Sequence, residues 1–169
     1  MLRHCQMLAD YNSWANARIY AAAGALSDAE YRQDKGAFFG SLHGTLNHLL
    51  VTDRLWMRRF TGTGPAPASL DAPLFDDLPA MKAARDAEDR RIADWLAGLE
   101  ETALARIVTY SALSAPVEIS QPLGLLLTHV FNHHTHHRGQ CHMTLTALGK
   151  PSVVLDLVHF LRQDGRQWL

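Results

Sequence analysis

The chain has 169 residues, of which 47% are hydrophobic, and its formal net charge is −1. This length and apolar content are those of one domain with a hydrophobic core. Basic and acidic residues are interspersed, which argues against a nucleic-acid-binding surface, and no apolar run approaches the ~18 residues of a membrane-spanning helix.

The first residues of the chain and its two cysteines indicate the cellular compartment in which we expect the protein. No apolar signal-peptide region precedes Asp10. The two cysteines, Cys5 and Cys141, are far apart in sequence and form no C-x-x-C motif, so a disulfide framework is not expected. We therefore expect a cytoplasmic protein.

Hydrophobic residues recur at helical spacing in four long segments, which are residues 3–25, 41–61, 77–99 and 122–148. Ser27 and Glu30 form a capping-box pair, which predicts a short helical turn after the first segment. The Gly- and Pro-rich segment 62–77 is expected to be a loop. Residues 102–121 hold two short β-branched stretches that could pair as a hairpin, and residues 153–163 are expected to form a short last helix.

These elements predict the fold class. Four amphipathic helices, each with one apolar stripe, bury those stripes by packing together. The expected fold is therefore all-α: a four-helix bundle with a short extra C-terminal helix and a small β-hairpin before the fourth long helix. Facing helices of a bundle often supply the ligands of a metal ion.

The last long helix contains the run T-H-V-F-N-H-H-T-H-H-R-G-Q, with five of the chain's ten histidines within nine residues. On a helical wheel His137 lies near the centre of the apolar stripe, with His133 and His134 on its flanks. His129 and His136 point away and are expected to be solvated. Because His133 and His137 are four residues apart, their side chains lie on one face, about 6 Å apart at Cβ, and could bind one ion.

A third ligand must come from another segment, and residues 41–60 are the best candidate. His48 lies at the edge of their apolar stripe, and Asp53 lies inside it, where a carboxylate needs a partner. One histidine from this helix and two from the later one would make a three-histidine site. Such a site leaves a coordination position open, as in catalytic more than structural metal sites.

Three segments resemble the DinB/YfiT-like family of metal-dependent proteins: Y-N-S-W-A-N near the start, H-L-L-V-T-D-R-L-W in the second helix and N-H-H-T-H-H-R-G-Q in the last. The resemblance covers essentially the whole chain in the right order. It implies a divalent metal ion bound by His48, His133 and His137, and it favours His48 over His43. It also implies up-down-down-up helix order, with a long crossover at residues 62–77.

The resemblance implies an enzyme that transfers a low-molecular-weight thiol to a small-molecule substrate, with metal-dependent hydrolysis as the next choice. The alternative is a metal-binding stress-related or regulatory protein without turnover, because no residue stands out as a nucleophile or general base. The metal is expected to be zinc or nickel, with iron or manganese also compatible. Relatives often pair, so a homodimer is expected, with neither a nucleic acid nor a membrane as partner.

Several residues near these motifs have two interpretations. For His134, packing against another helix is favoured over ligation. For Cys141, which continues the four-residue spacing from His137, a buried apolar role is favoured over a thiolate ligand. Asp53 and Glu88 are expected to be hydrogen-bonded or arginine-paired carboxylates rather than acceptors for a ligating histidine.

The remaining features are expected to be structural. A glycine within a helix costs about 1 kcal/mol relative to alanine, so Gly139 suggests close packing. Three arginines are expected on a solvated helix face, namely Arg54, Arg58 and Arg59, and three tryptophans in the core, namely Trp14, Trp56 and Trp95. No role follows from the residue types of Arg138 and Gln140.

Overall fold

The computed structural model describes residues 1–113 and 115–169. Its long helices are α1 (Leu2–Gly24), α3 (Leu42–Thr61), α4 (Leu78–Ala97) and α5 (Leu123–Ala147). Its shorter helices are α2 (Asp28–Arg32), α6 (Leu157–Arg162), η1 (Glu101–Ala105) and η2 (Arg166–Trp168). The strands β1 (Ile107–Ala112) and β2 (Ala115–Pro122) form an antiparallel hairpin. The predicted all-α bundle with a small hairpin and a short C-terminal helix is confirmed.

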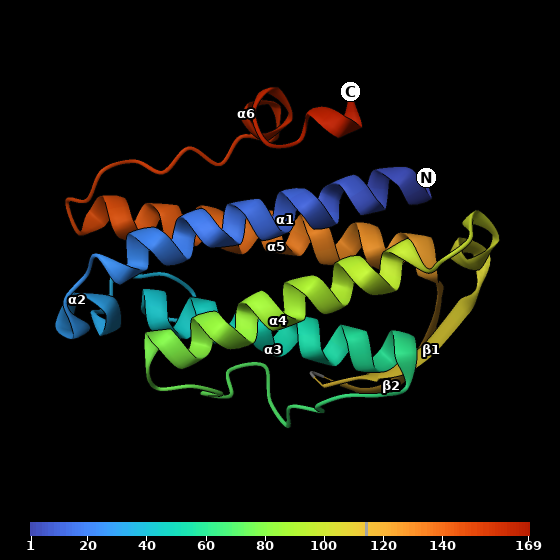
Figure 1. The fold of residues 1–169 in the computed structure, drawn as a ribbon. Helices are drawn as coiled ribbons and strands as arrows, with labels where there is room; N and C mark the ends of the chain where they lie inside the picture. The colour runs from blue at the N-terminus through green and yellow to red at the C-terminus, as the bar shows by residue number, and fades with distance from the viewer. Residues whose placement is uncertain (114) are drawn as a thin grey trace.

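The four long helices pack in up-down-down-up order (Figure 1). α1 and α5 run in one direction, while α3 and α4 run in the other. Each of α1 and α3 contacts both α4 and α5. Because α3 and α4 are parallel, the chain needs the long loop of residues 62–77 to return to the end at which α3 began.

Local sequence signals place the helix ends. The Ser41 hydroxyl accepts a hydrogen bond from the Gly44 amide and caps α3, and the Asp77 carboxylate accepts one from the Ala80 amide and caps α4. Gly62 ends α3 with a left-handed φ of 75°. The predicted helix bounds are therefore correct to within one or two residues for all four long helices.

The C-terminal helix begins later than expected. Residues 153–156, predicted to be helical, are extended, and α6 starts at Leu157. The Tyr11 hydroxyl of α1 donates to the Leu155 carbonyl at 2.6 Å, and Arg18 Nε donates to the Val154 carbonyl at 2.9 Å. These bonds use carbonyl groups that a helix would pair internally, so contact with α1 overrides the local pattern.

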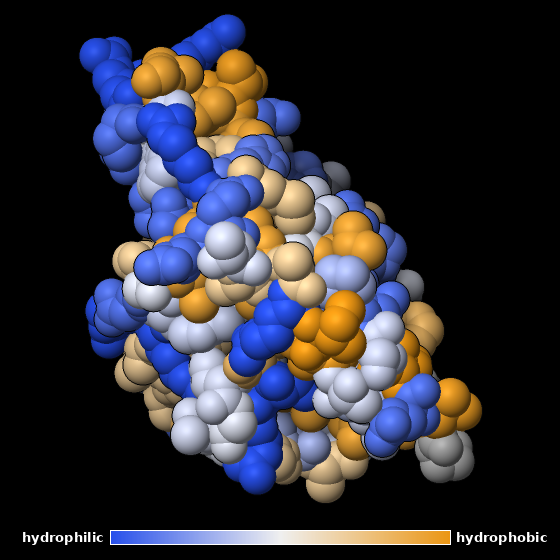
Figure 2. Space-filling model, turned by 90° about the vertical axis from the view of Figure 1, so that its right-hand side faces the viewer, coloured by the Kyte–Doolittle hydropathy of each residue, from blue (hydrophilic) through white to orange (hydrophobic). Residues whose placement is uncertain are grey.

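Both termini lie at the end of the bundle that carries the hairpin (Figure 1). The terminal ammonium of Met1 pairs with Glu101 at 2.8 Å. A view onto this end shows hydrophobic side chains in several groups among hydrophilic ones (Figure 2). Ile107 and Val117 of the hairpin are more than half exposed, at 58% and 57%. Homodimer formation stays a prediction.

The core has two large apolar clusters with a polar layer between them, and a small third cluster of Tyr11, Ala15 and Phe160 lies where α6 packs on α1. The cluster nearer the hairpin includes Cys5, Trp56, Phe60, Ile92, Leu96, Leu123 and Leu127. The other large cluster includes Ile19, Leu46, Leu50, Met81, Cys141 and Leu145. Between them, the middle of every long helix contributes buried polar side chains: Asn12, Asn16, Asp53, Arg85, Asp89, His134 and Arg138.

Candidate metal centre

The three histidines selected from the sequence lie together. His48 comes from α3, and His133 and His137 come from successive turns of α5. One ring nitrogen from each lies within 4.8 Å of the others, and the Nε2 atoms of His48 and His133 are 3.2 Å apart. His43 is not in this group; its Nε2 lies 2.9 Å from the Phe75 carbonyl oxygen.

Hydrogen bonds orient two of the rings. His48 Nδ1 donates to the carbonyl oxygen of Leu70, in the crossover loop, at 2.7 Å. His137 Nδ1 donates to the side-chain oxygen of Gln140, one turn further along α5, at 2.9 Å. With Nδ1 occupied, each ring presents Nε2 to the cluster, as ligating histidines held by an outer hydrogen bond do. This gives Gln140 a role that its residue type alone did not indicate.

Phe39 covers one side of the cluster. Its ring stacks on His48 with a centroid separation of 3.9 Å and lies 5.6 Å from the His137 ring. Phe39 belongs to a tight turn at residues 36–40 that packs on the first turn of α3. A Cβ atom at Gly44 would lie 2.2 Å from the Phe39 carbonyl oxygen, so only glycine allows this approach.

The cluster adjoins a pocket of about 310 Å³. His48 and His133 are in its wall, together with Thr52, Leu55, Trp56, Arg59, Leu70, Tyr110, Ala112, Leu113 and His129. The volume is at the lower end of that of small-molecule sites. A ligand in this pocket would therefore meet the histidine cluster directly.

The donor set fits a borderline divalent metal ion. Imidazole nitrogens bind zinc, nickel, copper and iron, and metal–nitrogen bonds of ~2.0–2.1 Å place neighbouring ligand atoms roughly 3 to 4 Å apart. The 3.2 Å between His48 and His133 meets this requirement, and the 4.8 Å limit for the whole group needs only small side-chain rotation. The site could thus hold a metal ion.

Burial keeps the three imidazoles neutral, which is the form that binds a metal. Burial, together with repulsion from the neighbouring histidines, lowers the pKa of His133 to about 3 and that of His137 to about 4, although the hydrogen bond to Gln140 acts in the opposite direction at His137. Burial also lowers the pKa of His48, although its hydrogen bond to Leu70 acts in the opposite direction. At neutral pH no proton competes strongly for the nitrogen lone pairs.

Arg59 differs from the prediction of a solvated arginine, and His129 has a contact that the sequence did not indicate. Arg58 is exposed, as expected, but Arg59 is half-buried and lines the pocket. Its guanidinium lies over the Trp56 and Tyr110 rings because the hairpin folds back onto α3. His129 is exposed as predicted, yet it also borders the pocket. The hairpin contact is non-local, and no spacing within α3 reveals it.

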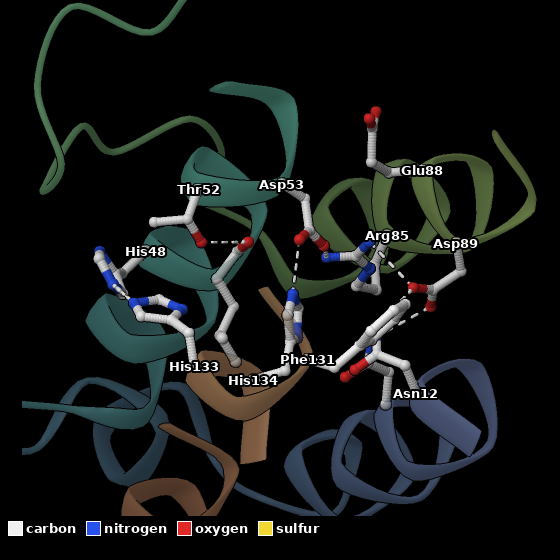
Figure 3. Close-up of polar contacts among 12 residues, drawn as sticks. Asn12, His48, Thr52, Asp53, Arg85, Glu88, Asp89, Phe131, His133 and His134 are labelled. Atoms are coloured by element: carbon white, nitrogen blue, oxygen red, sulfur yellow. Dashed lines mark hydrogen bonds and ion pairs between the residues drawn. The ribbon is translucent and has the colours of Figure 1, made fainter. Parts of the chain in front are cut away.

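His134 turns away from the cluster into the polar layer, as the favoured interpretation predicted. Its Nε2 donates to Asp53 at 2.5 Å, and the opposite oxygen of Asp53 pairs with Arg85 at 2.5 Å (Figure 3). Arg85 also pairs with Asp89 at 2.9 Å, and Asp89 accepts from Asn16 at 3.1 Å. Asp53 is therefore a buried, paired carboxylate, and burial, which would raise its pKa, is outweighed by attraction to His134 and Arg85.

The polar layer continues to Arg138 of the R-G-Q motif. Arg138 is 3% exposed and donates to the side-chain oxygens of Asn12 and Asn16. Its guanidinium lies 5.2 Å from the centroid of the Tyr11 ring. The contact joins α5 back to α1, so the layer links all four long helices.

The remaining assignments are mostly confirmed. Glu88 pairs with Arg91 at 2.8 Å, and it points away from the Asp53 group (Figure 3). Cys141 is fully buried, and burial raises its pKa to about 12, as expected for an apolar rather than a thiolate role. The expectation of close packing at Gly139 is wrong, because a Cβ atom there would meet nothing within 4 Å. Gly139 lies on an exposed part of α5.

Comparison with known proteins agrees with this architecture. The sequence matches the DinB family over residues 1–168. It is 28% identical over 157 residues to Protein DinB of Bacillus subtilis (strain 168), and the match covers 88% of each chain. Within residues 1–113 and 115–169, no helix combines the length and apolarity needed to cross a membrane. With a family match over nearly its full length and a bundle that brings three histidines together, this chain belongs to the DinB family.

Proposed function

We propose that this protein binds a divalent transition metal ion, zinc or nickel, through His48, His133 and His137, and that it is a metal-dependent enzyme. The observation that supports catalysis over metal binding without turnover is the pocket of about 310 Å³, whose wall includes two of the three histidines. Three protein ligands would leave a coordination position free for a ligand, and the space beside His48 and His133 is of ligand size.

The preferred reaction is transfer of a small thiol to an electrophilic substrate. When bound, a divalent ion lowers the pKa of a coordinated thiol or water and so makes a nucleophile available at neutral pH. The protein holds the imidazoles neutral, orients His48 and His137 by their Nδ1 hydrogen bonds, and shields one side with Phe39. Trp56 and Leu70 give the substrate an apolar surface.

The composition of the pocket favours a thiol over water as the nucleophile. No acidic side chain is among the described residues of its wall, so the carboxylate base that commonly activates a metal-bound water has no counterpart there. A free thiol has a pKa near 8.5, far below that of water, and needs much less assistance to ionise. Metal-dependent hydrolysis is therefore the second choice.

Metal analysis tests the ligand set. We expect about one zinc or nickel ion per chain after reconstitution and dialysis, and loss of that ion in His48→Ala, His133→Ala and His137→Ala. Two matched controls are His43→Ala and His136→Ala, which alter histidines of the same helices outside the cluster. Both controls should retain the ion.

The outcomes separate the parts of the proposal. Metal content unchanged in the three cluster variants would falsify the ligand assignment. A second assay measures the rate at which glutathione or cysteine is conjugated to a chloronitrobenzene electrophile. If the parent binds metal but is no faster in this assay than its His137→Ala variant, the metal site is retained and thiol transfer is rejected. Ester hydrolysis by the same metal-loaded protein would support the second choice.

A further inference from the structure

Arg59 occupies an unusual position in the pocket beside the histidine cluster. Its guanidinium carbon lies 4.5 Å from the centroid of the Trp56 ring and 4.4 Å from that of Tyr110. Its Nη2 donates to the backbone carbonyl of Ser111 at 2.9 Å. Two aromatic faces and one hydrogen bond hold the side chain in place, so its remaining N–H groups have a fixed direction.

The positive charge of Arg59 is not neutralised by a neighbour in the pocket. None of the described wall residues is acidic, and the polar ones are histidines, Thr52 and Tyr110. The Tyr110 hydroxyl is itself used in a bond to Gln121 at 2.9 Å. Burial lowers the pKa of Arg59, as expected for a cation removed from water without a carboxylate.

Apart from Thr52, the rest of the wall is apolar or aromatic. Trp56 and His129 are in edge-to-face contact at 5.4 Å, and His129 lies 5.7 Å from His133, so the aromatic surface extends from Arg59 to the cluster. Leu55, Leu70 and Leu113 complete it. A ligand that spans this surface would have its two ends at Arg59 and at the histidines.

We propose that the pocket selects a substrate with a carboxylate group at one end, bound by Arg59, and an apolar body whose other end reaches the metal position. This inference rests on the proposed metal site and adds the chemical class of the ligand. A planar guanidinium recognises a carboxylate through two parallel hydrogen bonds, and pairing in a partly dehydrated pocket strengthens them. A neutral ligand of the same length would leave the Arg59 charge uncompensated.

The test compares thiols of equal chain length that end either in a carboxylate or in an uncharged alcohol. Mercaptopropionate and mercaptohexanoate are titrated beside mercaptopropanol and mercaptohexanol into the cobalt-loaded protein, and the sulfur-to-cobalt absorption reports binding at the metal. Because Trp56 lines the pocket, quenching of tryptophan fluorescence by the same ligands reports binding without metal as well. We expect the better-fitting carboxylate to bind about tenfold more tightly than its alcohol.

The variants identify the residue responsible. Arg59→Gln should remove the preference for the carboxylate while leaving the affinity for the alcohol unchanged, which also shows that the pocket has kept its shape. Arg59→Lys should restore part of the preference, because a lysine keeps the charge but not the planar fork. Arg58→Gln is the matched control, since Arg58 is exposed and donates to the Gly64 carbonyl outside the pocket; it should behave as the parent.

Failure of this inference differs from failure of the metal proposal. Equal affinities for carboxylate and alcohol in the parent overturn the inference even if cobalt binds. The inference is also overturned if Arg59→Gln keeps the preference. The protein could also take up no metal and still show the Arg59-dependent preference by fluorescence. That result would reject the proposed metal chemistry and support the anion site at Arg59.

Discussion

At the scale of single residues, Asp53 is the clearest case of a charge that the fold must compensate. It is 1% exposed and lies between His134 and Arg85. Replacing it by asparagine leaves the Arg85 charge buried with one carboxylate fewer. We expect Asp53→Asn to lower the free energy of unfolding by about 3–5 kcal/mol, measured by urea denaturation followed by circular dichroism.

Asp86→Asn is the matched control for that change. Asp86 pairs at 2.6 Å with Lys82, which lies one turn before it in α4, but both side chains are exposed. Exposed pairs contribute at most about 1 kcal/mol, so the control should unfold close to the parent. If the two variants are equally stable, the polar layer does not depend on Asp53 in the way its geometry indicates.

At the scale of elements, two helical glycines differ in the space around them: Gly44 is in close contact with a turn, whereas Gly139 has free space beside it. Gly44→Ala places a Cβ atom 2.2 Å from the Phe39 carbonyl oxygen, so the turn must move and Phe39 must leave the His48 ring. We expect a loss of about 1–3 kcal/mol in the free energy of unfolding and weaker zinc binding. Thermal unfolding with and without zinc measures both effects.

Gly139→Ala is the opposite case within α5. Its Cβ atom meets nothing within 4 Å, and alanine favours a helix over glycine by about 1 kcal/mol. The variant should therefore gain stability and bind zinc as the parent does. If Gly139→Ala lowers the stability, or if Gly44→Ala does not, the space beside each glycine does not determine the effect of the substitution.

The contrast between these elements shows what sequence can and cannot predict. The four long helices and the shared face of His133 and His137 follow from 3.6-residue periodicity, which is local information. Phe39 and Leu70 reach His48 from loops, and the hairpin sets Arg59 in the pocket wall. Such contacts join segments distant in the chain, and no periodicity encodes them. The choice of His48 over His43 needed the family resemblance rather than the helical pattern.

At the scale of the whole molecule, stability should depend on pH through the buried histidines. In the folded protein the pKa is about 3 for His133 and about 4 for His137, against an ordinary value of 6.5. Between these limits the unfolded chain binds more protons, so acidification favours unfolding. The contribution is fully present above about pH 6.5 and is lost as the pH falls toward about 4 and then about 3.

We therefore expect the urea midpoint of the metal-free protein to decrease as the pH is lowered from about 7 to about 4.5. The free energy of unfolding should decrease by at most about 1.4 kcal/mol per pH unit for each histidine. The double variant His133→Gln and His137→Gln should show a smaller dependence over this interval. With zinc present the fall should be steeper, because protons then compete with the ion for the same nitrogens. A midpoint that does not change over the interval contradicts the burial of neutral histidines.

The polar layer also limits how the four helices can be arranged. Two apolar clusters made largely of leucine and other aliphatic side chains would tolerate a helix that slides by one turn, about 5.4 Å, since similar surfaces meet again. The same displacement of α3 would separate Asp53 from both His134 and Arg85, leaving Asp53 and His134 buried without each other and Arg85 paired with Asp89 but not with Asp53. The buried charges thus set the register of the helices, because they exclude shifted packings that the apolar clusters alone would accept. The register that they favour is the one in which His48 faces His133.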